Sequence, residues 1–159
     1  MAILCVISAR GGSQGLPSKN TKPLLGKPLI AWSIEQAHAT PEISRVVVST
    51  DSQEIAAIAR KYGAATPFSR PSHLATEYAG KWDVWQHALS ECEAFFGEQY
   101  EAFVDLDCTN PLRDVSDISN VINKLRERKL EGVKGVFTTC PSRKNPYFNM
   151  LEVDTSGAL

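Results

Sequence analysis

The feature that most constrains the fold is an apolar stretch, residues 3–7, that leads directly into a loop rich in glycine and positive charge, residues 9–20. The loop reads Ala-Arg-Gly-Gly-Ser-Gln-Gly-Leu-Pro-Ser-Lys-Asn. A buried strand followed by such a loop presents backbone N–H groups to anionic oxygens, while Arg10 and Lys19 supply the charge that N–H groups lack. This pattern predicts a site for the phosphates of a nucleoside triphosphate.

Two familiar phosphate loops do not match this spacing. A Walker loop requires Gly, four further residues and then Gly-Lys-Ser/Thr, and neither residues 15–19 nor residues 26–28 supply that order. The dinucleotide fingerprint requires glycines at its first, third and sixth positions, whereas Ser13 stands two residues after Gly11 and Pro17 interrupts the turn. A glycine-rich surface turn with incidental charges is the remaining alternative.

Apolar runs and helical patterns alternate along the chain, which is typical of a parallel sheet covered by helices. We therefore expect an α/β fold with a Rossmann-like, mostly parallel sheet and helices on both faces. A chain of 159 residues is too short for two domains with separate cores, so we expect one domain over residues 1–159. Strands are expected at residues 3–8, 45–49, 102–106 and 133–138, with a weaker one at 149–153. Helices are expected at 28–39 and 52–62, and around the apolar stripes of 85–96 and 115–125.

Polar residues follow each of the four stronger strands. Arg10 comes after the first, Asp51 after the second, Asp107 after the third and Arg143 after the fourth. Ligands of open parallel sheets bind at the carboxyl ends of the strands, so these side chains are expected at one edge of the sheet. Asp51 is also the expected N-cap of the helix at 52–62.

Charge and hydropathy limit the partners of such a domain. The formal net charge is −1, so no basic field attracts nucleic acid or a membrane surface. The longest apolar runs have the length of strands, and the N-terminus lacks a signal-peptide pattern, so a cytoplasmic protein is expected. The four cysteines are widely spaced without a Cys-x-x-Cys pair, which argues against a zinc site or a redox motif.

The glycine loop closely resembles the signature of the cytidylyltransferases that activate nonulosonic sugar acids such as sialic and legionaminic acid. The resemblance covers essentially the whole chain and continues, in the same order, through Lys22-Pro23-Leu24, Gly26-Lys27-Pro28-Leu29-Ile30, Val48-Ser49-Thr50-Asp51, Arg70-Pro71 with Leu74-Ala75, and Asn110-Pro111-Leu112-Arg113. Residues 104–107 and 143–149 are more similar to the legionaminic than to the sialic branch. The implied fold is that of the nucleotide-diphospho-sugar transferases.

The resemblance implies transfer of CMP from CTP to a nonulosonic acid with release of pyrophosphate. The residues that it places at the nucleotide are Ala9, Arg10, Gly12, Ser13, Lys19, Asn20, Arg70 and Ala75. Arg10 and Lys19 are the expected catalytic residues, because nucleotidyl transfer spreads negative charge over phosphate oxygens that cations stabilise. Arg143, Asn145 and Asn149 suit the carboxylate, amide and hydroxyl groups of the sugar acid, although Arg143 and Lys144 could equally form an ordinary exposed pair.

Two carboxylates, Asp105 and Asp107, stand two residues apart on a strand and therefore share a face. Asp107 lies nearer the strand end and is the expected Mg²⁺ ligand and substrate contact, because Mg²⁺ prefers carboxylate and phosphate oxygens. Sialic acid members usually carry Gln at this position, whereas related sugar-acid cytidylyltransferases have a metal-binding Asp. Asp105 is either a second functional carboxylate or a structural one.

The sequence departs from the family pattern in two places. Gln14 replaces a lysine that most members carry after the loop serine, so phosphate binding is expected to be modestly weaker. Family members also continue beyond residue 159 with a dimerisation segment and an Asp-containing motif that binds Mg²⁺, so we expect a truncated chain whose complete form is a homodimer. Two other functions stay open: a metal-dependent glycosyltransferase that binds a nucleotide-sugar, and an inactive nucleotide-binding fragment.

Overall fold

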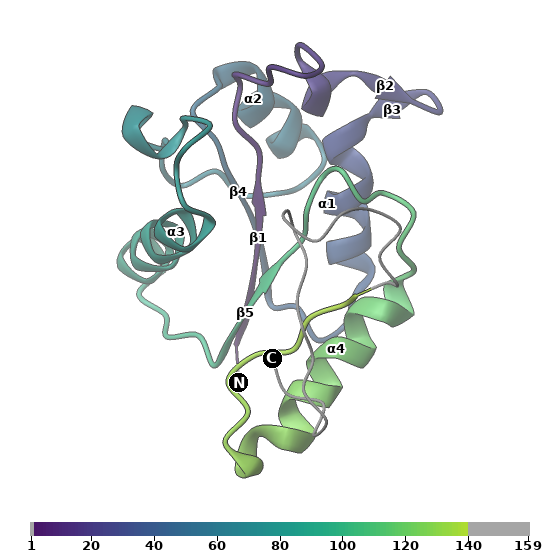
Figure 1. The fold of residues 1–159 in the computed structure, drawn as a ribbon, viewed down its shortest axis with the longest axis vertical. Coiled ribbons are helices and arrows are strands. Elements are labelled where there is room, and N and C mark those ends of the chain that lie inside the picture. The colour runs from purple at the N-terminus through teal and green to yellow at the C-terminus, as the bar shows by residue number, and fades with distance from the viewer. Residues whose placement is uncertain (1, 140–159) are drawn as a thin grey trace.

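A three-stranded parallel sheet forms the centre of the structure, a computed structural model that describes residues 2–139 (Figure 1). The strand order is β4-β1-β5, with β1 at Ile3–Ser8, β4 at Arg45–Ser49 and β5 at Ala102–Asp105. In this register Val6 pairs with Val47 on one side and with Asp105 on the other. The central strand β1 is apolar at successive positions rather than alternate ones because both of its faces are covered.

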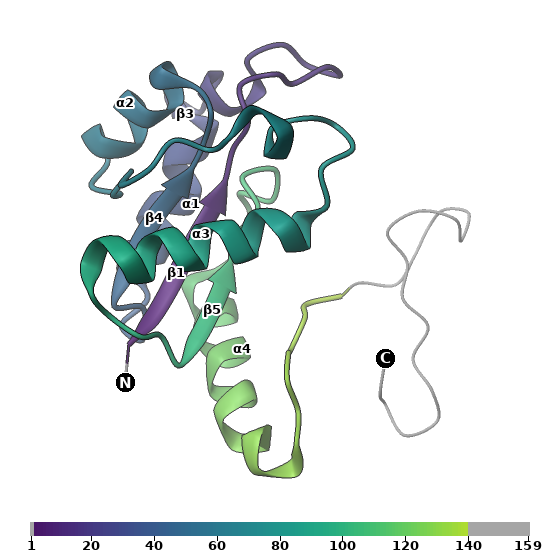
Figure 2. The same ribbon diagram turned by 90° about the vertical axis from the view of Figure 1, so that its left-hand side faces the viewer.

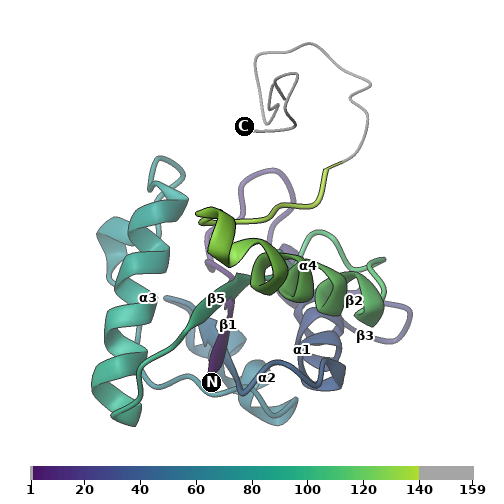
Figure 3. The same cartoon turned by 90° about the horizontal axis from the view of Figure 1, so that it is seen from below.

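Four α-helices within residues 2–139 cover both faces of the sheet (Figures 2 and 3). They are α1 at Leu29–Ala39, α2 at Gln53–Lys61, α3 at Lys81–Phe96 and α4 at Val115–Arg128. The odd-numbered residues of β1 pack with the buried stripes of α1, α2 and α4, whereas Leu4 and Val6 pack with Ala88 and Cys92 of α3. The predicted α/β fold with helices on both faces is confirmed.

Short elements connect the strands and helices of the described part of the chain. They are a β2–β3 hairpin at Pro23–Leu24 and Lys27–Pro28, and the 3₁₀ helices η1 at Lys19–Thr21, η2 at Ser72–Leu74 and η3 at Lys129–Glu131. The hairpin turns through Leu25 and Gly26, whose φ angles are 51° and 87°. Two successive positive φ angles are what a two-residue hairpin turn requires, and strands of two residues are too short to show an alternating pattern in the sequence.

The predicted strand at residues 133–138 is wrong. After η3 the chain turns at Gly132 and continues without sheet hydrogen bonds, and no residue from 133 to 139 is buried. An apolar, β-branched run forms a strand only where a partner edge supplies the ladder, and this segment leaves the sheet alongside α4 instead (Figure 2). The weaker strand predicted at 149–153 lies outside the described residues.

The predicted N-cap of α2 is displaced by one residue. Ser52, not Asp51, holds this position, and its Oγ accepts a hydrogen bond from the Ile55 N–H at 3.4 Å. The Asp51 carboxylate points to the glycine loop, where it accepts from the Gly11 N–H. None of the helices within residues 2–139 is both long and apolar enough to cross a membrane.

Candidate functional site

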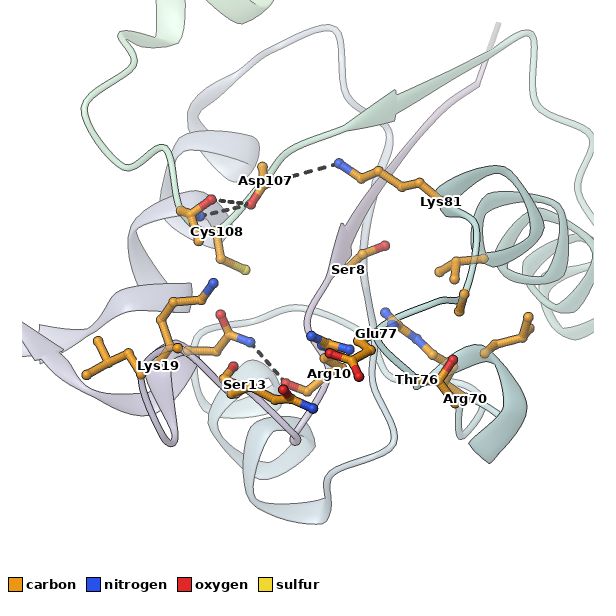
Figure 4. Close-up of a pocket in the computed structure, with 18 residues that line it drawn as sticks. Ser8, Arg10, Ser13, Lys19, Arg70, Thr76, Glu77, Lys81, Asp107 and Cys108 are labelled. Carbon is orange, nitrogen blue, oxygen red and sulfur yellow. Dashed lines mark hydrogen bonds and ion pairs between the residues drawn. The ribbon is translucent and has the colours of Figure 1, made fainter. Parts of the chain in front are cut away.

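A pocket of about 510 Å³ opens at the carboxyl ends of β1 and β5 (Figure 4). Its wall is built by four segments: the end of β1 with the glycine loop, the 70–79 loop, the first turn of α3, and the loop that follows β5. The carboxyl edge of a parallel sheet is where this fold class binds ligands, because the loops that leave neighbouring strands converge there.

The glycine loop is anchored at both of its ends. The Gly11 N–H donates to Asp51 Oδ1 at 2.9 Å, and Asn20 Nδ2 donates to the Arg10 carbonyl at 3.2 Å. A Cβ atom on Gly11 would lie 3.0 Å from Ser52 Cβ, whereas one on Gly12 would meet nothing within 4 Å. Gly11 is therefore required for close packing of the loop against the start of α2, while Gly12 is open to the surroundings.

Three cations line one side of the pocket: Arg10, Lys19 and Arg70. None of them belongs to an ion pair among residues 2–139. Arg70 is only 6% exposed, and its Nε and Nη2 donate to Ser49 Oγ at 3.1 Å and to the Ser49 carbonyl at 2.5 Å. Burial lowers the pKa of Arg70, but a guanidinium stays protonated, so the pocket holds a buried charge bonded to neutral oxygens.

The opposite wall carries an ion-pair network centred on Lys81. Lys81 Nζ lies 2.5 Å from Asp105 Oδ2 and 3.6 Å from Asp107 Oδ2, and Trp85 Nε1 donates to Asp105 Oδ1 at 3.1 Å. Burial alone would lower the pKa of Lys81, but the two carboxylates raise it. Asp105 does not line the pocket and is bonded to both Lys81 and Trp85, which favours a structural carboxylate over a second functional one.

Asp107 is fixed by neighbours on its own loop and by α1. Its Oδ1 accepts from the Thr109 N–H at 3.0 Å and from Thr109 Oγ1 at 2.8 Å. Burial would raise the pKa of Asp107, but these donors and the Lys81 charge lower it below its ordinary value. Arg113 Nη2 donates to the Asp107 carbonyl at 2.5 Å, while its Nη1 donates to Ser33 Oγ and so ties this loop to α1.

The described residues can offer a metal ion one carboxylate rather than a cluster. No group of three or more His, Cys, Asp or Glu side chains is placed to hold a metal within the described part of the chain. Mg²⁺ bound to a nucleotide takes most of its ligands from phosphates and water and often one or two carboxylates from the protein. The ionised Asp107 side chain on the pocket wall fits that smaller requirement.

Nine of the predicted site residues lie within residues 2–139, and the structure gathers six of them in this pocket. Those that line it are Arg10, Ser13, Lys19, Asn20, Arg70 and Asp107. Ala9 and Gly12 do not line it: Ala9 is buried with its N–H bonded to the Ser49 carbonyl at 3.0 Å. Ala75 is also absent from the lining, and its N–H donates to the Ser72 carbonyl at 3.0 Å. Arg143, Asn145 and Asn149 lie outside the described residues.

Sequence reasoning missed five polar residues that line the pocket: Ser8, Thr76, Glu77, Lys81 and Thr109. The position of Ser8 could have indicated a pocket residue, because it is the last residue of the predicted first strand and precedes the glycine loop. The sequence indicates the position of Lys81 less clearly, since Lys81 begins a helix that the apolar stripe identifies only from residue 85 onward. Thr76, Glu77 and Thr109 lie in loops without any distinguishing pattern.

Comparisons with known proteins agree with this geometry. Residues 4–148 match the sequence family described as Cytidylyltransferase. The Post-translational flagellin modification protein B of Campylobacter coli is 41% identical over 151 residues, which cover 95% of this chain and 63% of that protein. The CMP-N,N'-diacetyllegionaminic acid synthase of Campylobacter jejuni is 40% identical over 154 residues, which cover 97% of this chain and 64% of that protein. The chain thus spans less than two thirds of the length of both relatives.

A solved structure shares the fold at a greater evolutionary distance. The structure of CMP:2-keto-3-deoxy-manno-octonic acid synthetase complexed with CTP aligns with a TM-score of 0.65 over 81% of this chain and 49% of that one. The sequence identity is 21%, so this likeness supports the α/β fold alone. The family match, in contrast, extends over nearly the whole sequence and includes the glycine loop and the segment after β5. The chain therefore belongs to the cytidylyltransferase family.

Proposed function

We propose that the complete protein transfers CMP from CTP to a nonulosonic acid of the legionaminic or sialic type and releases pyrophosphate. The observation that carries this proposal is the cationic side of the pocket, where Arg10 and Lys19 of the glycine loop have no acidic ion-pair partner among residues 2–139. Charges left without counterions in a pocket favour a polyanionic ligand. The names of the relatives supply CMP and the sugar acid, and the solved structure complexed with CTP supports the choice of CTP.

The same residues account for how the reaction would be accelerated. A sugar hydroxyl attacks the α-phosphorus of CTP while pyrophosphate leaves, and negative charge spreads over the phosphate oxygens in the transition state. Lys19 and Arg10 would stabilise that charge, and Ser13 would donate a hydroxyl or backbone hydrogen bond to a phosphate oxygen. Because the loop is anchored through Gly11 and Asn20, these donors are positioned before the ligand arrives.

Asp107 is the residue that we propose for Mg²⁺ binding. A bound Mg²⁺ would neutralise triphosphate charge beside the cations of the glycine loop. Asp107 itself contributes an ionised carboxylate held in place by Thr109. The sugar-acid contacts of Arg143, Asn145 and Asn149 and a homodimer are further parts of the proposal that rest on the family resemblance. A cytoplasmic location is a further part that rests on the hydropathy of the sequence.

One alternative loses support from the geometry. A metal-dependent glycosyltransferase would use both carboxylates of its Asp-x-Asp motif on the metal. Here Asp105 is bonded to Lys81 and to Trp85, outside the pocket lining, so the pair does not present two free carboxylates. Measurement of the leaving group separates the two functions, because a glycosyltransferase releases a nucleotide rather than pyrophosphate.

The direct test is pyrophosphate release by the complete protein from CTP and Mg²⁺ with a panel of nonulosonic acids. We expect release with legionaminic or sialic acid and none with neutral hexoses. Lys19→Ala, compared with the exposed lysine variant Lys124→Ala as its matched control, should abolish the release. Pyrophosphate release that is absent with every sugar acid, or unchanged in Lys19→Ala, contradicts the proposal.

A further inference from the structure

One hydroxyl on the pocket wall forms no hydrogen bond in the free protein. Ser8 is the last residue of β1, and its Oγ is buried without a hydrogen-bond partner. Within the described residues, the other two buried side-chain atoms without partners belong to His87 and Glu101, and neither of these residues lines the pocket. Buried polar groups are almost always hydrogen-bonded, so an unpartnered hydroxyl in a pocket wall points to a ligand atom.

The position of Ser8 indicates which part of a nucleotide it would meet. Ser8 lies between the Lys81–Asp107 wall above it and Arg10 and Arg70 below it (Figure 4). The triphosphate belongs with the glycine loop, where the unpaired cations of the loop are. The neutral nucleoside end therefore extends away from the loop, toward Ser8 and Arg70.

The pocket lining also includes apolar side chains that suit a flat heterocycle. Leu74, Ala79 and Val84 are apolar, and they share the pocket with the Ser8 hydroxyl and the Arg70 guanidinium. A pyrimidine has apolar faces and an edge of hydrogen-bond donors and acceptors, and a serine hydroxyl can both donate and accept. A ribose offers hydroxyl groups but no comparable apolar face.

We propose that the Ser8 hydroxyl hydrogen-bonds the pyrimidine base of the bound nucleotide and is satisfied only in the complex. The inference rests on the proposed nucleotide-binding function and adds a base-binding residue to it. The proposal predicts that loss of the hydroxyl has opposite effects on the stability of the free protein and on its affinity for the nucleotide. Removing an unsatisfied hydroxyl from the free protein relieves an unfavourable burial, whereas removing it from the complex breaks a hydrogen bond.

Ser8→Ala tests both effects in one variant of the complete protein. We expect an unfolding temperature equal to or above that of the wild type in the absence of ligand. In calorimetry, CTP should bind about two- to tenfold more weakly, the loss expected for one neutral hydrogen bond. Ser8→Thr keeps the hydroxyl and should retain CTP affinity within about twofold.

Ser119→Ala is the matched control, because this serine lies on α4 and its Oγ donates to Glu42 Oε2 at 2.9 Å. Removing a satisfied hydroxyl should lower the unfolding temperature and leave CTP affinity unchanged. A lower unfolding temperature for Ser8→Ala with unchanged CTP affinity would identify Ser8 as merely structural and overturn the proposal.

Two further probes locate the contact. Inorganic tripolyphosphate should bind the wild type and Ser8→Ala equally, because it has no base. Ribose 5-triphosphate should also bind both equally; if it loses affinity as CTP does, the contact is with the ribose and the base assignment is wrong. Wild-type protein that binds neither CTP nor tripolyphosphate contradicts the proposed function itself, whereas equal binding of CTP by wild type and Ser8→Ala contradicts only the role of Ser8.

Discussion

Gly11→Ala tests whether the glycine loop must pack against the start of α2. The new Cβ would lie 3.0 Å from Ser52 Cβ, and carbon atoms in ordinary contact are about 3.5–4.0 Å apart. The loop would have to move by about 0.5–1 Å to restore that spacing. The movement would stretch the 2.9 Å hydrogen bond from the Gly11 N–H to Asp51 Oδ1.

The expected decrease in the free energy of unfolding has two contributions, overpacking and the weakened hydrogen bond. Overpacking costs about 1–3 kcal/mol, and the net loss of a hydrogen bond to a partly exposed carboxylate adds about 1 kcal/mol. The loop surface is free to yield, so we expect a total of about 2 kcal/mol. For a chain of this size that loss lowers the unfolding temperature by about 4–8 °C.

Gly12→Ala is the matched control, since nothing lies within 4 Å of its added Cβ. We expect its free energy of unfolding to stay within about 0.5 kcal/mol of the wild type. Thermal and urea unfolding of both variants, followed by circular dichroism, measure the difference. Combining Gly11→Ala with Asp51→Ala should cost less than the sum of the single changes, because both break the same bond. Equal stabilities of the two glycine variants, or a fully additive double variant, would refute this reasoning.

Three further predictions concern the charged residues of the pocket. Lys19→Ala should lower kcat far more than CTP affinity, because its charge acts mainly in the transition state; equal losses in single-turnover rate and in calorimetric affinity would reject that role. Asp107→Asn should weaken binding of Mn²⁺ in the presence of CTP, measured by electron paramagnetic resonance, and raise the Mg²⁺ concentration needed for turnover; unchanged metal binding would exclude Asp107 as a ligand. Asp107 should also stabilise the fold in a pH-dependent way: its pKa is lowered on folding, so its contribution is present above the ordinary aspartate pKa of about 3.9 and is lost as pH falls further. Because Asp107 is half exposed, Asp107→Asn should cost at most about 1 kcal/mol at pH 7, and a urea titration at pH 3 should show a smaller difference from the wild type than at pH 7.

The features that the sequence predicted well are those in which local pattern and tertiary role coincide. The continuous apolar run of β1 indicated a strand covered on both faces, and the loop that follows it can be recognised from its glycines and charges alone. Arg10, Lys19 and Asp107 could be assigned to one site because parallel strands bring their carboxyl ends to a common edge.

The features that the sequence did not predict depend on contacts between distant segments. Lys81 meets Asp105 and Asp107 only because the first turn of α3 lies beside the end of β5. Asp51 had the residue type and position of an N-cap, but the nearby Gly11 N–H recruited its carboxylate and left the cap to Ser52. Residues 133–138 have strand-forming side chains, yet strand formation requires a neighbouring ladder that local propensity cannot reveal.

The measurement that tests the central claim most directly is a crystal structure of the protein with CTP bound. The account predicts triphosphate density against Arg10, Ser13 and Lys19 of the glycine loop, with the cytosine beside Arg70 and within hydrogen-bond distance of Ser8 Oγ. Triphosphate density that contacts neither Arg10 nor Lys19, or a nucleotide bound outside this pocket, would contradict it.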